Sequence, residues 1–438
     1  MSTPGIPNRL GLIRAIGRWG LTAAVINSVI GSGVFGLPST LAGFAGAWSP
    51  VTVLIAGAGI LVIVLCFAEV ASRFDGPGGP YLYNRAVFGR AFGFQIGWLH
   101  IWTRLISAAA VLNVLSSYLA PLVPWAGTPT GRASVMVATM TLVTTVNLIG
   151  VRRASWTINA FTIAKLLPLV LLIVLGLFHF DKSVVGTQTV AEPNWTEAVL
   201  ILMFGYGGFE SGIVAGSESR DPKKDTAFAL FTAMTAITVI YCLIQLAVVG
   251  ILPHAAESKA PIAEALRVLL GPFGLTLGSI AVIISVYGWL TGFSLMSSRI
   301  FYSMAERNEF PPVFAVVNAR FRTPHAAIIA NSAIALGLGL ASNFGQLVPF
   351  SAIGRLGIFI ATCSALISLR RKLGNPETFR APGGPLLAVI GVAFCLWLLS
   401  TRRLDQVWFL PVIVLVGGIV WFAMSGYRRA APQPSIDS

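Results

Sequence analysis

Long apolar runs separated by short polar segments cover almost the whole of this chain. A helix needs roughly 20 apolar residues to cross a bilayer core of about 30 Å, and twelve runs are long enough. They lie at residues 17–42, 47–72, 93–121, 132–151, 155–178, 193–217, 226–252, 271–303, 324–342, 346–369, 383–401 and 405–427. The pattern predicts an all-α polytopic membrane protein with 12 transmembrane helices in a single domain, residues 1–438.

Composition and charge agree with this prediction. Hydrophobic residues make up 55% of the chain and charged residues 11%, well below the share of about 25% in soluble domains. The net charge of +14 does not indicate nucleic-acid binding, because the basic residues lie in short loops. With the N-terminus inside, 21 of the 30 Lys and Arg residues flank the inner ends of spans and 6 flank the outer ends. The positive-inside rule therefore predicts a plasma (inner) membrane protein with both termini cytoplasmic.

Cysteine placement and the N-terminal segment exclude two other classes of protein. Cys66, Cys242, Cys363 and Cys395 all lie within apolar runs, so they predict neither a disulfide framework nor a metal site. The first apolar run is too long for a signal peptide and has no cleavage site, so we interpret it as the first span. We expect no metal and no cofactor.

Two spans contain glycines where an apolar helix should continue. GSG at residues 31–33 interrupts the first span, and GYGG at 205–208 interrupts the sixth. The breaks lie five spans apart, so the matching helices run in opposite directions. Paired breaks in inverted halves point to the binding site of a transporter. The halves would be residues 16–178 and 193–369, with 383–427 forming two further helices. Glycines that only permit close helix packing are the alternative.

A pair of broken helices offers specific chemistry. In a bilayer, a break is tolerated only where the backbone is buried in protein or lines a wet cavity. Free N–H groups at the start of the second half-helix attract a carboxylate. Free C=O groups at the end of the first half attract an ammonium. Two breaks together therefore predict a site for the charged α-carboxyl and α-amino groups of an amino acid.

Four stretches resemble the amino acid–polyamine–organocation (APC) transporters. They are VIGSGVFGLP at the first break, FAEVASRFDGPGGPYLY (67–83), FGYGGFESGIVAGSESRDPKKD (204–225) and SSRIFYSMAERNEFPPVF (297–314). The resemblance implies a LeuT-type fold, a 5+5 inverted repeat with helices 1 and 6 broken and two appended helices. It also implies secondary active transport by alternating access.

The resemblance implies which backbone groups hold the substrate. Amides that bind the carboxylate would be those of Gly31, Ser32 and Gly33. Carbonyls that bind the ammonium would lie near Val29, Ile30, Phe204 and Gly207. Gly205 and Tyr206 belong to the same second break and complete the predicted site.

Three aromatic side chains are also implied by the resemblance. Phe204 and Phe209 match aromatic or bulky positions that cover the substrate. Phe293, in the eighth span, falls where a relative has a tryptophan gate. Without the family, aromatic residues in spans would be interpreted as core or lipid contacts.

Lys165 lies deep in the fifth span, where a charge is expensive and suggests a functional site. Apolar residues surround it for a full turn on both sides, which makes it hard for the side chain to reach the interface. Burial disfavours the ammonium form, and family members carry a lysine at this position. We expect Lys165 either to couple transport to protons or to tie neighbouring helices together with a fixed charge.

Glu210 and His100 are two further polar residues at membrane depth. Glu210 directly follows the second break and matches a family glutamate that links the break to neighbouring helices. It could brace the break or take part in proton transfer. His100, in the third span, is interpreted as a packed histidine or as a proton relay.

Arg104 and Arg355 lie in the third and tenth spans and depart from the arginine and polyamine exchangers of the family. A buried arginine stays charged, so each requires an anion. With Lys165 they outnumber Glu210, and a cationic substrate would be repelled. Arg104 could instead pair with Glu210 and carry no information about the substrate, so both interpretations stay open.

The sequence therefore predicts a transporter of amino acids, with proton-coupled uptake of neutral or acidic amino acids as the first interpretation. An amino acid or amine exchanger (antiporter) and a transporter-like nutrient sensor are the alternatives. An enzyme is not expected, because no nucleophile–base or metal constellation occurs at membrane depth. The expected partners are the amino acid, protons and the lipid bilayer, without nucleic acid, in a monomer or homodimer.

Overall fold

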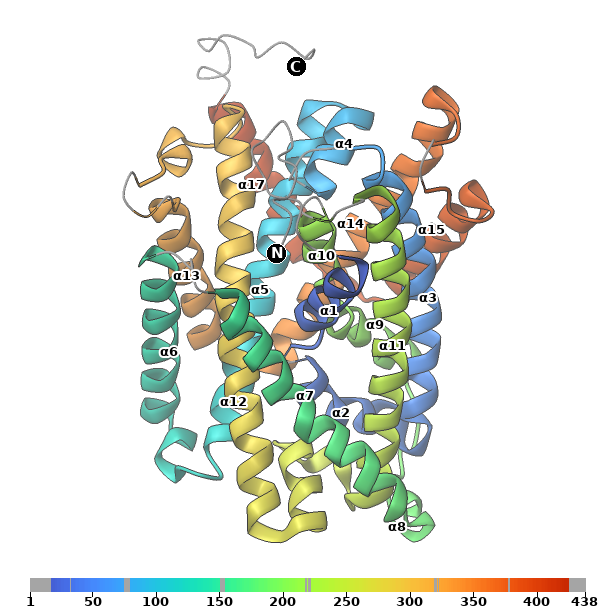
Figure 1. The fold of residues 1–438 in the computed structure, drawn as a ribbon, viewed down its shortest axis with the longest axis vertical. Coiled ribbons are helices and arrows are strands. Elements are labelled where there is room, and N and C mark those ends of the chain that lie inside the picture. The colour runs from blue at the N-terminus through green and yellow to red at the C-terminus, as the bar shows by residue number, and fades with distance from the viewer. Residues whose placement is uncertain are drawn as a thin grey trace, which may run out of the picture.

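The chain folds into a bundle of helices, which confirms the predicted all-α class. The computed structural model describes residues 17–31, 33–74, 79–149, 154–216, 219, 222–318, 321, 323–376 and 379–424. Within these ranges the elements are helices, with no strand. Figure 1 shows α4 at one end of the bundle and α8 at the opposite end.

The α-helices differ widely in length. They are α1 (Arg18–Val29), α2 (Gly33–Ala45), α3 (Ser49–Ala71), α4 (Pro80–Phe88), α5 (Arg90–Leu119), α6 (Pro129–Ile149), α7 (Ala154–Phe178), α8 (Lys182–Gly186), α9 (Trp195–Gly205), α10 (Phe209–Gly216), α11 (Pro222–Ile251), α12 (Pro261–Glu306), α13 (His325–Ala341), α14 (Phe344–Leu373), α15 (Gly384–Ser400), α16 (Leu404–Val407) and α17 (Phe409–Ala423). Short 3-10 helices are η1 (Gly46–Trp48), η2 (Pro124–Gly127), η3 (Ala255–Glu257) and η4 (Pro312–Ala315).

Several helices are long and apolar enough to cross a membrane. Six stretches of the described residues meet both conditions: 33–71, 90–119, 129–149, 224–251, 261–306 and 344–373. Shorter apolar helices lie at 165–178, 195–205, 325–341, 384–400 and 409–423. Leu415, Ile419 and Phe422 on α17 are exposed, and an apolar outer surface of this kind suits lipid. The chain is a polytopic membrane protein, whereas the count of twelve spans stays a prediction.

Helix α12 begins earlier than the predicted eighth span. The sequence placed its start at Gly271, but the helix starts at Pro261 and has a kink at Gly271, where φ is 65° and ψ is −151°. Proline is well tolerated in the first turn, where its missing N–H has no helical partner. Glycine at the kink adopts a positive φ without a steric penalty.

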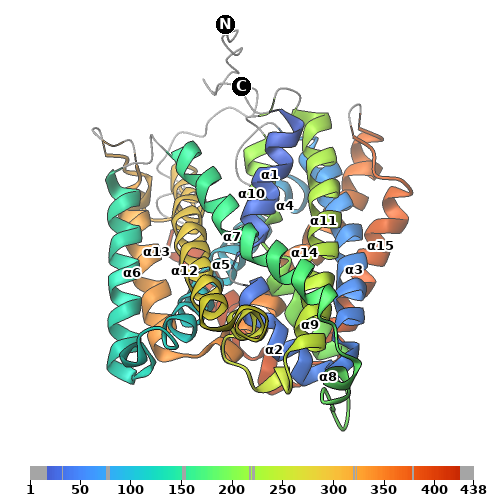
Figure 2. The same ribbon diagram turned by 60° about the horizontal axis from the view of Figure 1, so that its bottom comes forward.

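The long helix α5 forms the centre of the bundle and packs against α4, α12, α13 and α14. Both views show it among the other helices (Figures 1 and 2). Ala108, Ala109 and Ala110 are fully buried on it, and small side chains let neighbouring helices approach closely. Polar residues on α5 are therefore held inside the protein rather than against lipid.

Helix α4 is fixed to the end of α12 by the buried carboxylate of Glu309. The carboxylate accepts hydrogen bonds from Tyr81 Oη at 2.6 Å and Arg85 Nε at 3.0 Å. Arg90 Nε lies 3.4 Å away and also donates to it. Burial and the adjacent Glu309 raise the pKa of Tyr81, which therefore keeps its proton for this hydrogen bond. Helix α4 also contacts α14, because Asn84 Nδ2 lies 3.5 Å from Thr362 Oγ1.

Removing this carboxylate should destabilise the end of the bundle that holds α4. We expect Glu309→Ala to lower the free energy of unfolding by about 1–3 kcal/mol, because the buried Tyr81 hydroxyl loses its acceptor. Thermal unfolding of the purified protein in detergent measures the change. Glu306→Ala is the matched control, since Glu306 bonds Tyr302 at an exposed position. Equal melting temperatures for the two variants would contradict the assignment.

Candidate functional site

Both predicted helix interruptions are present, and they lie against each other. Helix α1 ends at Val29 and α2 begins at Gly33, while α9 ends at Gly205 and α10 begins at Phe209. Ser32, predicted to bind the carboxylate, lies outside the described residues. A side chain on Gly33 would meet the backbone of Gly205. Helices α1 and α10 also pack together and lie side by side in both views (Figures 1 and 2).

The glycine at position 208 is required by the backbone. Its φ is 118°, a conformation that L-residues rarely adopt. A Cβ atom there would also overlap the carbonyl oxygen of Ser28. In return, Ser28 Oγ donates to the Gly208 carbonyl at 3.1 Å. Gly208 therefore allows the two breaks to touch.

Two side chains donate to the backbone carbonyls that the breaks leave open. Tyr241 Oη lies 3.3 Å from the Val29 oxygen and 3.1 Å from the Gly205 oxygen. Lys165 Nζ donates to the carbonyls of Asn27 at 2.7 Å and Ile30 at 2.6 Å. Since Lys165 is buried, its ammonium ties α7 to the end of α1. The structure thus gives the Ile30 carbonyl, predicted to bind the substrate ammonium, a lysine ammonium as its partner.

Glu210 and Arg355 form a buried ion pair beside the second break. Arg355 Nη1 lies 3.1 Å from Glu210 Oε1, and the two side chains are 3% and 2% exposed. Glu210 also accepts from the Gly208 amide at 2.9 Å, so it braces the break directly. Arg355 Nη2 donates to Ser107 Oγ on α5 at 3.2 Å. Its guanidinium lies so close to Gly207 that a Cβ atom there would overlap it.

Arg104 has different contacts. Its Nε donates to Ser297 Oγ on α12 at 2.7 Å, and its guanidinium lies over the ring of Phe293, 5.8 Å from the centroid. Phe293 in turn stacks on Trp289 with ring centroids 5.5 Å apart. Arg104 of α5, Phe293 and Trp289 therefore form a continuous stack between α5 and α12.

Trp289 is a site residue that we did not predict from the sequence. Its indole lies directly against Gly31, where a Cβ atom would overlap it. The signal was available, because residues 289, 293 and 297 recur at intervals of four on one face of α12. Phe293 was predicted as the gate, but Trp289 is the ring that reaches the first break.

The remaining predicted aromatic positions differ in what they contact. Phe204 meets Phe344 edge to face at 6.1 Å and lies next to Gly33. Phe209 packs among Phe67 of α3 and Phe359 of α14, which are core contacts. The hydroxyl of Tyr206 donates to the Val53 carbonyl of α3 at 3.0 Å, so this side chain packs against α3.

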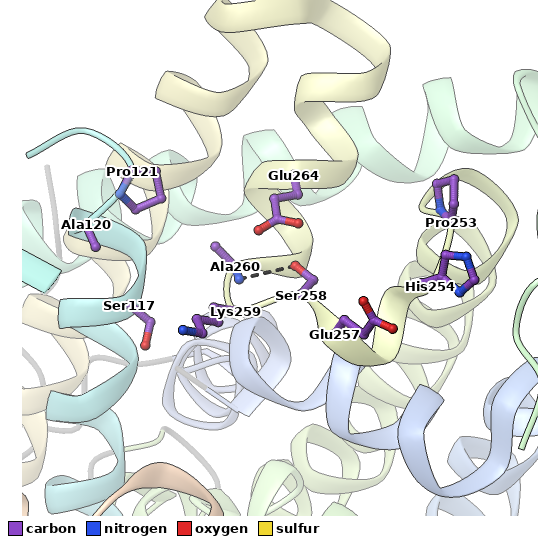
Figure 3. A pocket seen from close by; sticks show the side chains of 10 residues that line it. All are labelled: Ser117, Ala120, Pro121, Pro253, His254, Glu257, Ser258, Lys259, Ala260 and Glu264. Carbon is purple, nitrogen blue, oxygen red and sulfur yellow. Dashed lines mark hydrogen bonds between the residues drawn. The ribbon is translucent and has the colours of Figure 1, made fainter. Parts of the chain in front are cut away.

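A cavity of 490 Å³ opens at the end of the bundle opposite α4 and does not include either break. Ser117 at the end of α5 and Glu264 at the start of α12 line it, together with His254, Glu257 and Lys259 of the loop between α11 and α12. Figure 3 shows these side chains and the hydrogen bond from the Ala260 amide to Ser258. The candidate site is therefore the buried region at the two breaks and not this cavity.

Breaking the buried ion pair at one partner should be more damaging than removing both charges. We expect Arg355→Met to lower the free energy of unfolding by about 3–5 kcal/mol, because Glu210 then stays buried without this partner. Adding Glu210→Gln should restore much of the loss. Thermal unfolding of the two single variants and the double variant in detergent measures the coupling. Strictly additive losses would show that the pair does not act as a unit.

Comparison with known proteins places this chain in a family. The serine/threonine exchanger SteT of Bacillus subtilis is 27% identical over 434 residues, covering 94% of this chain and 95% of its own. The methylthioribose transporter of the same organism is 25% identical, with 94% and 92% covered. The arginine/agmatine antiporter of Chlamydia pneumoniae is 25% identical, with 94% and 90% covered. Residues 16–426 match the family described as amino acid permease, so the chain belongs to this family of APC transporters and is not an enzyme.

Proposed function

We propose that this protein carries an amino acid across the plasma membrane by alternating access, with the substrate held between the two helix breaks. The observation that carries this proposal is the direct contact of the first break with the second, across Ser28 and Gly208. In the proposed LeuT-type arrangement, residues 16–178 and 193–369 are inverted repeats and 383–427 form two appended helices. We propose that both termini lie in the cytoplasm, which the predicted excess of basic residues in the inner loops supports.

The start of α2 is the proposed carboxylate site. Helix α2 has 13 residues, and the N–H groups of its first turn, beginning at Gly33, have no carbonyl partner within the helix. These donors and the helix dipole favour an anion. At the end of α1 the Val29 carbonyl accepts from Tyr241 and the Ile30 carbonyl from Lys165. The substrate ammonium would share these acceptors, since a carbonyl oxygen has two lone pairs. Trp289 against Gly31 is then positioned to cover the bound substrate.

Lys165 is the proposed coupling residue. Its contacts in the described part of the chain are the carbonyl oxygens of Asn27 and Ile30, and an ammonium buried beside neutral acceptors is held less firmly than one beside a carboxylate. Loss of its proton would weaken the tie between α7 and α1, and α1 would then be free to move. We therefore propose proton-coupled uptake as the first mode of transport.

Exchange is the second candidate, and the relatives support it. SteT is named as an exchanger of serine and threonine, and the Chlamydia protein as an antiporter of arginine and agmatine. For this chain, Arg104 and Arg355 at the site oppose a cationic substrate. Neutral or acidic amino acids are therefore the proposed cargo in either mode.

Uptake into proteoliposomes separates the two modes. The purified chain is tested with labelled amino acids, with and without an inward proton gradient and with and without unlabelled amino acid inside. Proton-coupled uptake of one proton per substrate predicts accumulation of up to about tenfold with an inward pH gradient of one unit, which is worth about 1.4 kcal/mol, and none without it. Stimulation only by internal amino acid would establish exchange instead.

The same assay tests Lys165. Lys165→Ala should abolish stimulation by the gradient, because the titrating group is removed, while binding of the amino acid persists. Lys182→Ala, in the exposed helix α8, is the matched control and should behave like the wild type. Gradient-driven uptake that survives in Lys165→Ala would contradict the role of Lys165.

A further inference from the structure

One face of α5 carries polar side chains on the side of the helix that is connected through Arg355 to the second break. His100, Arg104 and Ser107 follow at intervals of four and three residues, so they share this face. Arg104 reaches Ser297 on α12, and Ser107 accepts from Arg355 on α14. Arg355 in turn lies against Gly207 of the break. Residues of α5, α12 and α14 thus surround one side of the proposed substrate site.

His100 and Arg355 have buried polar atoms that no other described group satisfies. His100 is 5% exposed, and neither of its ring nitrogens has a hydrogen-bond partner; the same is true of Arg355 Nε. The imidazole lies within electrostatic range of Glu210, Arg355 and Arg104. Buried polar groups in native proteins are nearly always paired, with protein, water or ligand. The unpaired atoms therefore point to a polar occupant beside the second break.

We propose that His100 and Arg355 bind the side chain of the transported amino acid and select a short side chain that carries an oxygen atom. This inference rests on the proposed function, because it takes the two breaks as the site of the α-carboxyl and α-amino groups. Arg355 Nε is a donor, and an imidazole offers one donor and one acceptor. A hydroxyl can accept from the first and donate to the second, whereas a carboxylate can accept from both.

The length and the charge of the substrate side chain are also restricted by these residues. The guanidinium of Arg355 lies directly against Gly207, and we infer that only a short substrate side chain fits beside it. Glu210 is bonded to Arg355 and to the Gly208 amide, so its charge is already compensated. A lysine or arginine substrate would meet two guanidinium groups and a neutralised carboxylate. An apolar side chain would leave Arg355 Nε and the ring nitrogens of His100 unpaired.

Competition between side chains of nearly equal size tests the inference. Proteoliposomes containing the full chain take up labelled serine, and unlabelled threonine, valine, serine, alanine, aspartate and lysine compete. We expect threonine to compete at least about tenfold better than valine, and serine to compete at least about tenfold better than alanine. Leaving one buried polar group unsatisfied costs a free energy of that order. Lysine should not compete. Aspartate competing as well as serine would also support the inference and would extend it to carboxylates.

Variants of His100 link the preference to this residue. His100→Leu should lower the threonine-to-valine ratio several-fold, with the remaining preference due to Arg355 Nε, and His100→Gln, which keeps a donor and an acceptor, should retain more of the preference than His100→Leu. Ser116→Ala is the matched control, because Ser116 Oγ is also buried and unpaired on α5 but lies farther towards the end of the helix. Its ratio should equal that of the wild type.

The outcomes separate this inference from the proposed function. Wild-type protein that transports valine as readily as threonine, or a ratio unchanged in an active His100→Leu variant, would overturn the selection of an oxygen atom and leave amino acid transport intact. Wild-type protein that takes up no amino acid in either direction would instead overturn the proposed function. The threonine-to-valine ratio is measured on the wild-type protein. It therefore still tests the inference if the His100→Leu variant does not fold.

Discussion

Backbone groups freed by two helix breaks inside a bilayer are the constraint on which the rest of the structure depends. No water is available in the hydrocarbon core to bond them, so the protein itself must supply partners. Tyr241 donates to carbonyls of both breaks, and Lys165 donates to the carbonyl of Ile30. Glu210 accepts from the Gly208 amide. Helices α7 and α11 are held in place around the breaks by these contacts.

The charges near the breaks follow from the same constraint. Glu210 satisfies a backbone amide, but a buried carboxylate needs a cation, and Arg355 of α14 provides it. Arg355 then lies against Gly207, and its Nε–H has no hydrogen-bond partner among the described residues; in the proposed site this donor is left for the substrate. A residue that stabilises the break thus also limits which side chains fit. In this proposal Arg355 therefore both stabilises the second break, through Glu210, and selects the substrate.

Features with a local signal were predicted well from the sequence. The breaks were predicted because glycines interrupt apolar runs, and the structure has interruptions at both positions. The burial of Lys165 followed from its apolar neighbours. The partners of the charged residues could not be predicted, because Arg355 and Glu210 are 145 residues apart and several pairings satisfied the same charge balance. Trp289 lies four residues before Phe293 on the same face of α12, a spacing that the sequence shows, but the resemblance implies a role for Phe293 alone.

The central claim is that the two breaks hold both charged ends of one amino acid, and equilibrium binding tests it most directly. Isothermal titration calorimetry of the purified protein compares serine with ethanolamine, which lacks the carboxylate, and with N-acetylserine, which lacks the ammonium. The account predicts that each derivative binds about 10- to 100-fold more weakly than serine, the loss expected for one charged hydrogen-bonded group. Ethanolamine and N-acetylserine that bind as tightly as serine would contradict it.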